Sequence, residues 1–235
     1  MFLVCCSDKN KNELLKKIKQ TNFFASYSES NFEFLDIMHL LPIRKNILKL
    51  EKTIDQYNYI ILVSPNCIDF AKTAIVKANF PEFMVMGYDS YKVLSHFSSK
   101  KIHYPKRLTG SAGLIEEIIK DLDLLNKKIL IVTGGFRNKI IENKLHEFGA
   151  VYEVLDVYET KMFDLPIETI KKITRIPTYR GIIITSSSLV AWLFAKAEDN
   201  GFIDILREIT FVTWHKNILI KLKELGVVQV NFIQS

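Results

Sequence analysis

The chain has 235 residues, of which 48% are hydrophobic and 25% charged, with a formal net charge of +6. This length suits one large or two modest α/β domains, and two of about 110 residues match the common domain size. No apolar stretch approaches the ~20 residues of a membrane span. The first apolar run, residues 2–6, is shorter than the ~7–15 residue core of a secretory signal, and the three cysteines are typical of buried reduced thiols. We therefore expect a cytoplasmic protein with no membrane segment.

The positive charge has two interpretations, a polyanionic ligand or a lysine-rich composition produced by AT-rich coding. The lysines are scattered and form no stripe interleaved with exposed aromatic residues, which argues against nucleic acid as the partner.

In the first half of the chain, short apolar runs alternate with amphipathic segments. The pattern predicts a strand over 2–6, a helix over 11–19, a strand over 32–39 leading into 40–43, a strand over 59–63 with a following helix, a strand over 83–86, a helix near 91–97, an extended piece at 102–104 and a helix over 112–125. Ser111 is the expected N-cap of the last helix, with Glu116 and Glu117 in or near its first turn.

The second half repeats this alternation. It predicts a strand over 127–132, a helix from about 138 to 148 closed by Gly149, a strand over 152–158, a connecting segment with Pro166 and Pro177, a strand over 181–185 with its helix, a strand over 209–213, a helix over 218–225 capped by Gly226 and a strand over 227–232. Alternating strands and helices are typical of parallel sheets with helices on both faces, so the predicted class is α/β.

One local pattern occurs twice, over 57–64 and over 179–186. Each copy is an apolar run that ends in small polar residues at the start of a helix, where ligands of open α/β sheets bind. The duplication predicts two similar domains, each with a ligand-binding edge, and a cleft between them. Periodicity leaves open a tandem division near Asn126 or a crossed arrangement with both chain ends in one domain.

Several residues are candidates for chemistry. Thr133-Gly134-Gly135-Phe136-Arg137 could hold an anion or form a tight turn with an exposed arginine, and it lacks the glycine spacing of a dinucleotide site. Tyr158 could act as an acid or be a half-buried aromatic residue at a strand end. The hydroxyls at Ser64 and at 185–188 are expected to cap helices first and to contact an anion second, because no nucleophile elbow surrounds them. Metal-ligand spacing and a P-loop are absent from the sequence.

Several segments, taken in this order, resemble the uroporphyrinogen-III synthase family. They are 59–66 (Tyr-Ile-Ile-Leu-Val-Ser-Pro-Asn), 84–94 (Met-Val-Met-Gly-Tyr-Asp-Ser-Tyr-Lys-Val-Leu), 113–118, 128–137, 148–160 and 182–188. Each motif alone is weak, and the shared order over ~170 residues carries the resemblance.

The resemblance implies two flavodoxin-like or Rossmann-like parallel-sheet domains in the crossed arrangement, with a ligand cleft between them. Domain 1 would comprise 1–38 and 167–235 and domain 2 would comprise 44–160, with extended linkers at about 39–43 and 161–166. It also implies a cofactor-free lyase of haem and sirohaem synthesis that cyclises hydroxymethylbilane, a linear polycarboxylate tetrapyrrole. Loss of the terminal hydroxyl would give an azafulvene, and closure through a spiro intermediate would invert ring D. We expect a cytoplasmic monomer with no nucleic acid or membrane partner. Transient contact with hydroxymethylbilane synthase is compatible with this expectation.

By this resemblance, Tyr158 matches a tyrosine suggested to act as the acid. The matching substrate-binding positions are Ser64, Ser90, Arg137, Thr185, Ser186 and Ser187. Two positions depart from the family pattern: its second Gly-x-x-Thr-Ala turn falls on 214–218, without the glycine or threonine, and Ser7-Asp8 replaces an Arg-Pro. These departures leave open a diverged, non-catalytic binder of an anionic small molecule. A nucleotide-dependent transferase is disfavoured by the missing glycine pattern.

Overall fold

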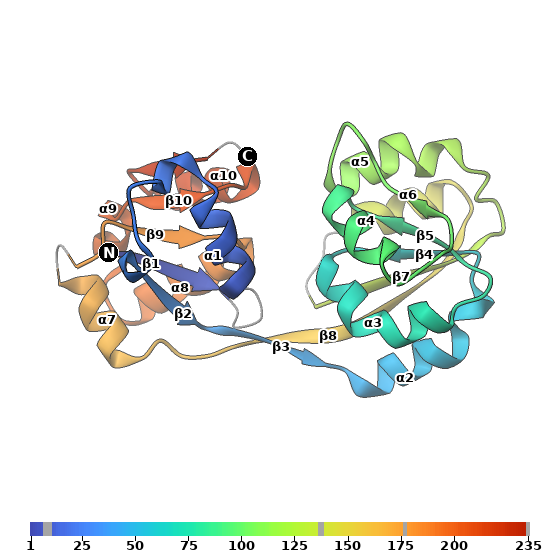
Figure 1. Cartoon of the computed structure of the whole chain (residues 1–235), viewed down its shortest axis with the longest axis horizontal. Coiled ribbons are helices and arrows are strands. Elements are labelled where there is room, and N and C mark those ends of the chain that lie inside the picture. The colour runs from blue at the N-terminus through green and yellow to red at the C-terminus, as the bar shows by residue number, and fades with distance from the viewer. Residues whose placement is uncertain (7–10, 136–138, 176–177, 234–235) are drawn as a thin grey trace. The chain divides into compact units, whose positions relative to one another are not determined.

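The structure of the chain is a computed structural model, and it describes residues 1–6, 11–135, 139–175 and 178–233. The chain divides into two compact units (Figure 1). Unit 1 comprises Met1–His39 and Lys161–Ser235, and unit 2 comprises Leu40–Thr160. Both chain ends therefore belong to unit 1, whereas one continuous segment forms unit 2.

Unit 1 is built on a parallel sheet, whose described strands follow the order β11-β10-β9-β1-β2. An inner strand of such a sheet needs apolar residues on both faces, and all of β1 is buried. Phe2 of β1 pairs with Phe32 on one side and with Gly181 on the other. The strands are β1 (Phe2–Cys6), β2 (Phe32–Asp36), β9 (Gly181–Ile184), β10 (Phe211–Thr213) and β11 (Val230–Phe232).

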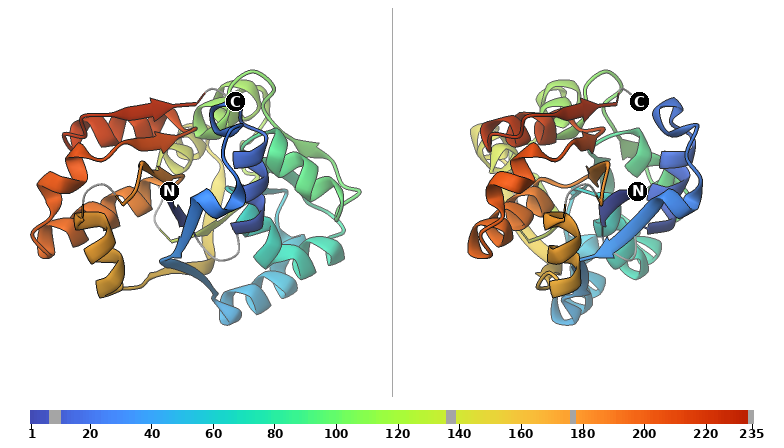
Figure 2. Two further views of the ribbon diagram at one scale, coloured as in Figure 1. Left: turned by 60° about the vertical axis from the view of Figure 1, so that its left-hand side comes forward. Right: turned by 90° about the vertical axis from the view of Figure 1, so that its left-hand side faces the viewer.

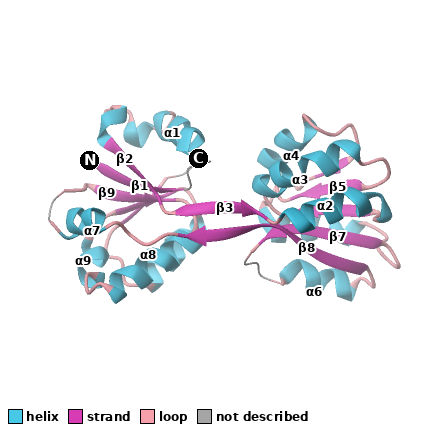
Figure 3. Ribbon diagram, turned by 90° about the horizontal axis from the view of Figure 1, so that it is seen from below, coloured by secondary structure: helices cyan, strands magenta, loops and turns pink. Residues whose placement is uncertain are grey.

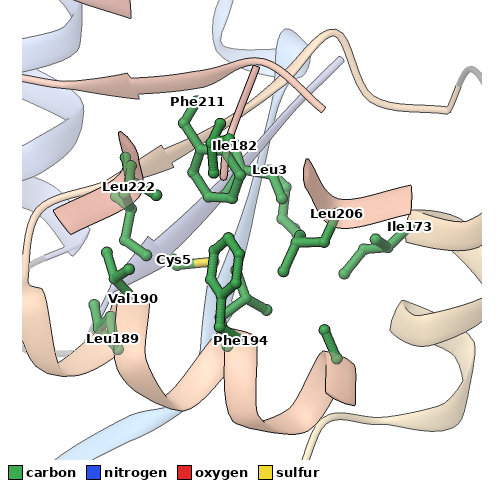
Figure 4. Packing of buried hydrophobic residues seen from close by; sticks show 14 of the residues in the cluster. Leu3, Cys5, Ile173, Ile182, Leu189, Val190, Phe194, Leu206, Phe211 and Leu222 are labelled. Atoms are coloured by element: carbon green, nitrogen blue, oxygen red, sulfur yellow. The ribbon is translucent and has the colours of Figure 1, made fainter. Parts of the chain in front are cut away.

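Helices cover both faces of this sheet (Figure 2). Alternate residues of β1 point to opposite faces, and all of them are apolar and buried, so each face needs a covering layer. Phe2, Val4 and Cys6 pack with Leu14 and Ile18 of α1. Leu3 and Cys5 point the other way, into the cluster formed by the remaining helices (Figure 4). The helices are α1 (Lys11–Lys19), α7 (Ile167–Thr174), α8 (Ser187–Asp199), α9 (Ile203–Glu208) and α10 (Lys216–Glu224).

Unit 2 contains a second sheet, with the described strands in the order β3-β8-β7-β4-β5-β6. All pairs from β8 to β6 are parallel. The strands are β3 (Met38–Pro42), β4 (Tyr59–Leu62), β5 (Glu82–Val85), β6 (Ile102–His103), β7 (Lys128–Gly134) and β8 (Val151–Met162). Ile60 and Leu62 of β4 face the cluster on one side of the sheet, and Ile61 faces the cluster on the other.

The helices of unit 2 divide between these two clusters. Leu50, Cys67 and Leu94 bring three helices onto one face, and Leu114 and Ile141 bring two onto the other. The helices of the first face are α2 (Arg44–Thr53), α3 (Pro65–Lys77) and α4 (Tyr88–Ser95), and those of the second are α5 (Gly110–Glu117) and α6 (Ile140–Glu147). The predicted α/β class with two parallel-sheet units is confirmed.

Two extended segments pass from one unit to the other, β3 and the long strand β8, which pair with each other (Figure 3). The Ile43 N–H donates to the Val157 carbonyl, and the Phe163 N–H donates to the Ile37 carbonyl, each at 3.0 Å. Residue numbers rise along one strand as they fall along the other, so the pair is antiparallel. Most of the residues expected to form linkers therefore belong to a two-stranded ribbon.

Several elements differ from the sequence-based predictions. The strand expected over 32–39 is two strands, β2 and β3. The helix expected over 112–125 begins at Gly110, with Thr109 at its N-cap, and ends at Glu117. The expected cap Ser111 and the expected first-turn acids Glu116 and Glu117 are therefore wrong, because the helix starts and ends earlier along the chain.

Candidate functional site

The strand orders place a topological switch point in each sheet. In unit 1 the chain adds β2 on one side of β1 and β9 on the other, which is the flavodoxin-like order. In unit 2 it adds β5 and β6 on one side of β4, then β7 and β8 on the other, which is the Rossmann-type order. Ligands of open α/β sheets bind outside the carboxyl ends of the strands at such points. The candidate regions are therefore the ends of β1 and β9 and the ends of β4 and β7.

Ser64 follows β4 and caps α3. Its extended backbone (φ −158°, ψ 162°) precedes Pro65, and its Oγ accepts the Cys67 N–H at 3.3 Å. A proline is well tolerated in the first turn of a helix, because the N–H groups of that turn have no carbonyl acceptor within the helix. The predicted capping role is confirmed, and it fixes the Ser64 hydroxyl beside the start of α3.

Tyr158 reaches the same region because β8 is irregular. The pairing of β7 with β8 shifts between Thr133 and Gly134, so that Gly134 lies opposite Tyr158. Such a bulge interrupts the alternation of side chains, and the consecutive residues Val157 and Tyr158 are both buried in the same cluster. The bulge thereby turns Tyr158 onto the face covered by α3, where its ring stacks on Phe70 at 5.1 Å between centroids.

Gly134 is required by this packing. A Cβ atom there would lie 2.1 Å from Cζ of Tyr158, closer than real contacts allow. The ring of Tyr158 is thus held between Gly134 and Phe70, and the side chain is buried.

Burial raises the pKa of Tyr158 above its usual 10.0, and polar interactions with Ser64 and Asn66 act in the opposite direction. The phenol is therefore neutral at physiological pH and able to donate a proton or a hydrogen bond. The structure brings together Tyr158, Ser64 and the first turn of α3.

The other candidates of unit 2 lie elsewhere or outside the described residues. Ser90 is buried in the first turn of α4, after β5. Arg137 lies outside the described residues, as does Ser7-Asp8 of unit 1. The glycines of the 133–137 segment are described, and Gly134 supports Tyr158.

Two features near the end of β5 were not predicted. The Glu117 carboxylate accepts hydrogen bonds from three backbone N–H groups. The donors are Lys106 at 2.9 Å, Arg107 at 3.1 Å and Leu108 at 2.7 Å. This carboxylate fixes the loop that leads into α5, and Gly110 in turn donates its N–H to the Met86 carbonyl at 2.8 Å.

The second feature is a tyrosine cluster formed by Tyr88, Tyr91 and Tyr104. Their ring centroids lie 4.3 to 6.0 Å apart, and Lys92 Nζ lies 5.7 Å from the Tyr88 centroid. Three tyrosines within 17 residues are the only sequence signal of this cluster, and no helical or strand period joins all three.

In unit 1, the three predicted residues follow β9. Ser186 caps α8, and its Oγ accepts the Ser188 N–H at 3.2 Å, which confirms the predicted capping role. Ser187 is exposed in the first turn, and its carbonyl accepts a hydrogen bond from Lys221. Thr185 lines a pocket of about 230 Å³. The other lining residues are Glu13, Leu14, Lys17 and His215.

Within the described ranges, His, Cys, Asp and Glu side chains form no group of three placed to hold a metal ion. No helix among the described residues has the length and apolar character needed to cross a membrane. Cys5, Cys6 and Cys67 are buried, as predicted, and none of the three is in a disulfide.

Comparison with known proteins gives one family and one fold. The family described as uroporphyrinogen-III synthase HemD matches residues 34–232. A mutant uroporphyrinogen III synthase from the bacterium Thermus thermophilus superposes with a TM-score of 0.62 at 12% identity, covering 100% of this chain and 92% of that chain. Uroporphyrinogen-III synthetase from Helicobacter pylori superposes with a TM-score of 0.60 at 17% identity, covering 99% of this chain and 93% of that chain. No curated protein sequence matches the chain significantly. At these identities the structural likeness shows the fold, and the family match rests on the sequence.

Proposed function

The chain belongs to the uroporphyrinogen-III synthase family of cyclising lyases, and we propose that Tyr158 serves as the acid of its reaction while hydroxyls at the two switch points hold the substrate. The family reaction closes hydroxymethylbilane to uroporphyrinogen III, with loss of water and inversion of ring D. The observation that carries the assignment of the acid is the bulge in β8, which turns Tyr158 to the end of β4 beside Ser64.

The chemistry asks for a proton donor at the terminal hydroxyl of the substrate. A neutral phenol can transfer its proton as the carbon–oxygen bond breaks, so that water leaves and an azafulvene remains. Burial keeps the Tyr158 phenol protonated, as its raised pKa indicates. The substituted carbon of ring D then attacks the electrophilic methylene carbon of the azafulvene, and the resulting spiro intermediate opens and recloses with that ring inverted.

The larger task is conformational, because unassisted closure of hydroxymethylbilane gives the type I isomer. Holding a flexible chain in one reactive geometry lowers the barrier by removing the entropy of alternative conformers. Ser64, Ser90, Arg137, Thr185, Ser186 and Ser187 are the residues we propose for this role. Ser64 and Ser186 each lie at the first turn of a helix of 13 residues, where the helix dipole and free N–H groups favour carboxylates.

We also propose that the enzyme acts as a cytoplasmic monomer that receives its substrate from hydroxymethylbilane synthase through transient contact. Three buried cysteines, none of them in a disulfide, support a reducing compartment. The scattered lysines of the sequence support a small polyanion, not nucleic acid, as the ligand.

Isomer analysis tests the function. Hydroxymethylbilane is generated in situ, the purified protein is added, and the products are oxidised and separated as type I and type III uroporphyrins. We expect type III to predominate. Type I formed at the spontaneous rate would refute the synthase activity of this chain.

A further inference from the structure

The turn after β10 is one of the two positions that depart from the family pattern, and the structure describes the residues that form it. Strand β10 ends at Thr213 and α10 begins at Lys216. The buried Thr213 hydroxyl accepts the His215 N–H at 3.3 Å. The strand-to-helix turn therefore forms without the glycine and threonine that the family pattern places over 214–218. Trp214 and His215 are the two residues between β10 and α10.

Lys17 of α1 lies against this turn. Its Nζ is 5.3 Å from the centroid of the Trp214 ring, a distance at which a cation is attracted to an aromatic face. Trp214 is buried, so it forms a fixed base for the long lysine side chain. Within the described ranges Lys17 forms no ion pair, so its charge is available to a ligand.

Lys17, His215 and Thr185 line one pocket of about 230 Å³. They come from α1, the end of β10 and the end of β9, so three separate elements contribute to it. The pKa of His215 is lowered below its usual 6.5, first because the surrounding protein removes water and second because Lys17 is positively charged. His215 is therefore mainly neutral near pH 7, and a bound anion would offset the Lys17 charge and favour protonation of the imidazole.

The charges of the pocket indicate which anion fits. Glu13 also lines it, and its negative charge offsets part of the positive charge of Lys17. A dianion such as phosphate would therefore be favoured less than a single carboxylate. An ammonium group, an imidazole N–H and the Thr185 hydroxyl offer a carboxylate three donors. The start of α10, a helix of nine residues, adds the positive end of its dipole.

We propose that Lys17, His215 and Thr185 bind one carboxylate of the tetrapyrrole substrate, and that this site replaces the glycine-threonine turn of the family. This inference rests on the proposed function for the identity of the ligand. Lys17 and His215 are positioning residues for substrate, whereas Tyr158 is assigned to the chemistry.

Kinetics with a matched pair of lysine variants tests the proposal. Lys16 is an exposed neighbour on the same helix and does not line the pocket, so Lys16→Gln removes the same charge without touching the site. We expect Lys17→Gln to raise KM for hydroxymethylbilane about 10-fold with kcat nearly unchanged, as loss of a charge-assisted contact to bound substrate predicts. Lys17→Arg should recover most of the loss, and His215→Asn should raise KM several-fold. Equal KM values for Lys16→Gln and Lys17→Gln would overturn the proposal.

A binding measurement separates this inference from the activity. The chain has two tryptophans, so a Trp192→Phe background leaves Trp214 as its single reporter. Its fluorescence is followed while uroporphyrinogen III is added under anaerobic conditions. If the protein makes no type III product yet Lys17→Gln weakens this binding about 10-fold relative to Lys16→Gln, the proposed function fails and the site stands. No binding by the parent protein, or equal binding by the two variants with melting temperatures unchanged, would refute the site.

Discussion

Tyr158 shows how one irregular hydrogen-bond register can place a reactive group. Without the bulge opposite Thr133 and Gly134, residues 157 and 158 would face opposite sides of the sheet. With it, both enter the cluster beneath α3. A single register shift thus sets the surroundings, the pKa direction and the neighbours of the phenol.

Tyr158→Phe should therefore lower the rate of type III formation by at least several-fold while leaving the fold intact. The ring would still stack on Phe70, and a lost hydroxyl contributes only about 0.5–1.5 kcal/mol to the free energy of unfolding. Initial rates and urea denaturation measure the two effects. Tyr152→Phe, a change to a half-buried tyrosine on the same strand, is the control. Equal rates for Tyr158→Phe and the parent would remove Tyr158 from the mechanism.

Glu33 provides a test of pH dependence. Its pKa is lowered, first because the carboxylate accepts a hydrogen bond from Lys172, while partial burial opposes this and a hydrogen bond from Tyr179 adds to it. A carboxyl group whose pKa is lower in the folded state stabilises the protein above its unfolded pKa of about 4.5 and loses that contribution as pH falls through the folded value.

Glu33→Gln should thus be less stable than the parent at pH 7, and the difference should shrink below pH 4.5. Melting temperatures across pH 3 to 7 measure it. Glu168→Gln is the control, since this exposed residue pairs with Lys171 on the surface of the same helix as Lys172. A difference in melting temperature between Glu33→Gln and the parent that stays constant from pH 3 to 7 would contradict the role of Glu33.

At the residue scale, local roles could be predicted and long-range ones could not. Ser64 and Ser186 were identified as caps because a cap is decided by the few residues that follow it. The three N–H groups bound by Glu117 come from residues nine to eleven positions earlier, on a loop whose path no local pattern fixes. Lys17 and His215 are almost 200 residues apart, and only the folded sheet brings them to one pocket.

At the scale of elements, the loop before α5 depends on one carboxylate. Glu117→Ala should release the N–H groups of Lys106, Arg107 and Leu108 and accelerate their exchange with solvent at least 10-fold, because each loses its acceptor. Hydrogen exchange followed by NMR measures the rates. Glu116→Ala is the matched control, since Glu116 contacts only the Lys120 side chain at 3.5 Å among the described hydrogen bonds. Unchanged exchange in Glu117→Ala would show that other contacts hold the loop.

The strands were easier to predict than the helices, for a physical reason. Inner parallel strands such as β4 and β9 are buried on both faces and appear as unbroken apolar runs. Helix α2 buries fully only Leu50 and has a mainly polar sequence, so it gave no strong apolar period. The segment that forms helix α7 was expected to be a connection with Pro166 and Pro177, yet Pro166 lies at the N-cap of α7, where a proline breaks no helical hydrogen bond.

At the scale of the whole molecule, the net charge of +6 should influence binding of a polycarboxylate substrate. We expect KM for hydroxymethylbilane to rise as salt increases, because the screening length falls from ~10 Å at 0.1 M to ~3 Å at 1 M ionic strength. Initial rates at several concentrations of potassium chloride measure it, with kcat at saturating substrate as the internal control. A KM independent of salt would mean that the basic composition serves no binding role.

The fold class followed from the alternation of elements, but the division of the chain did not. A buried parallel strand has the same composition in either sheet, so periodicity could not distinguish a tandem division from a crossed one. What distinguishes them is pairing, and β1 pairs with β9 near the other end of the chain.

This pairing has a consequence for synthesis on the ribosome. The chain emerges from its N-terminus, so β1 and β2 appear early, yet β1 has an open edge until β9 follows. Such an edge exposes unpaired backbone groups and invites aggregation. Unit 2, a continuous segment, can complete its sheet in the meantime, and the ribbon of β3 with β8 then brings Ile37 and Phe163 together. Folding of unit 2 during synthesis would in this way bring the two parts of unit 1 together. Strands β9, β10 and β11 would then remain to be added to its sheet.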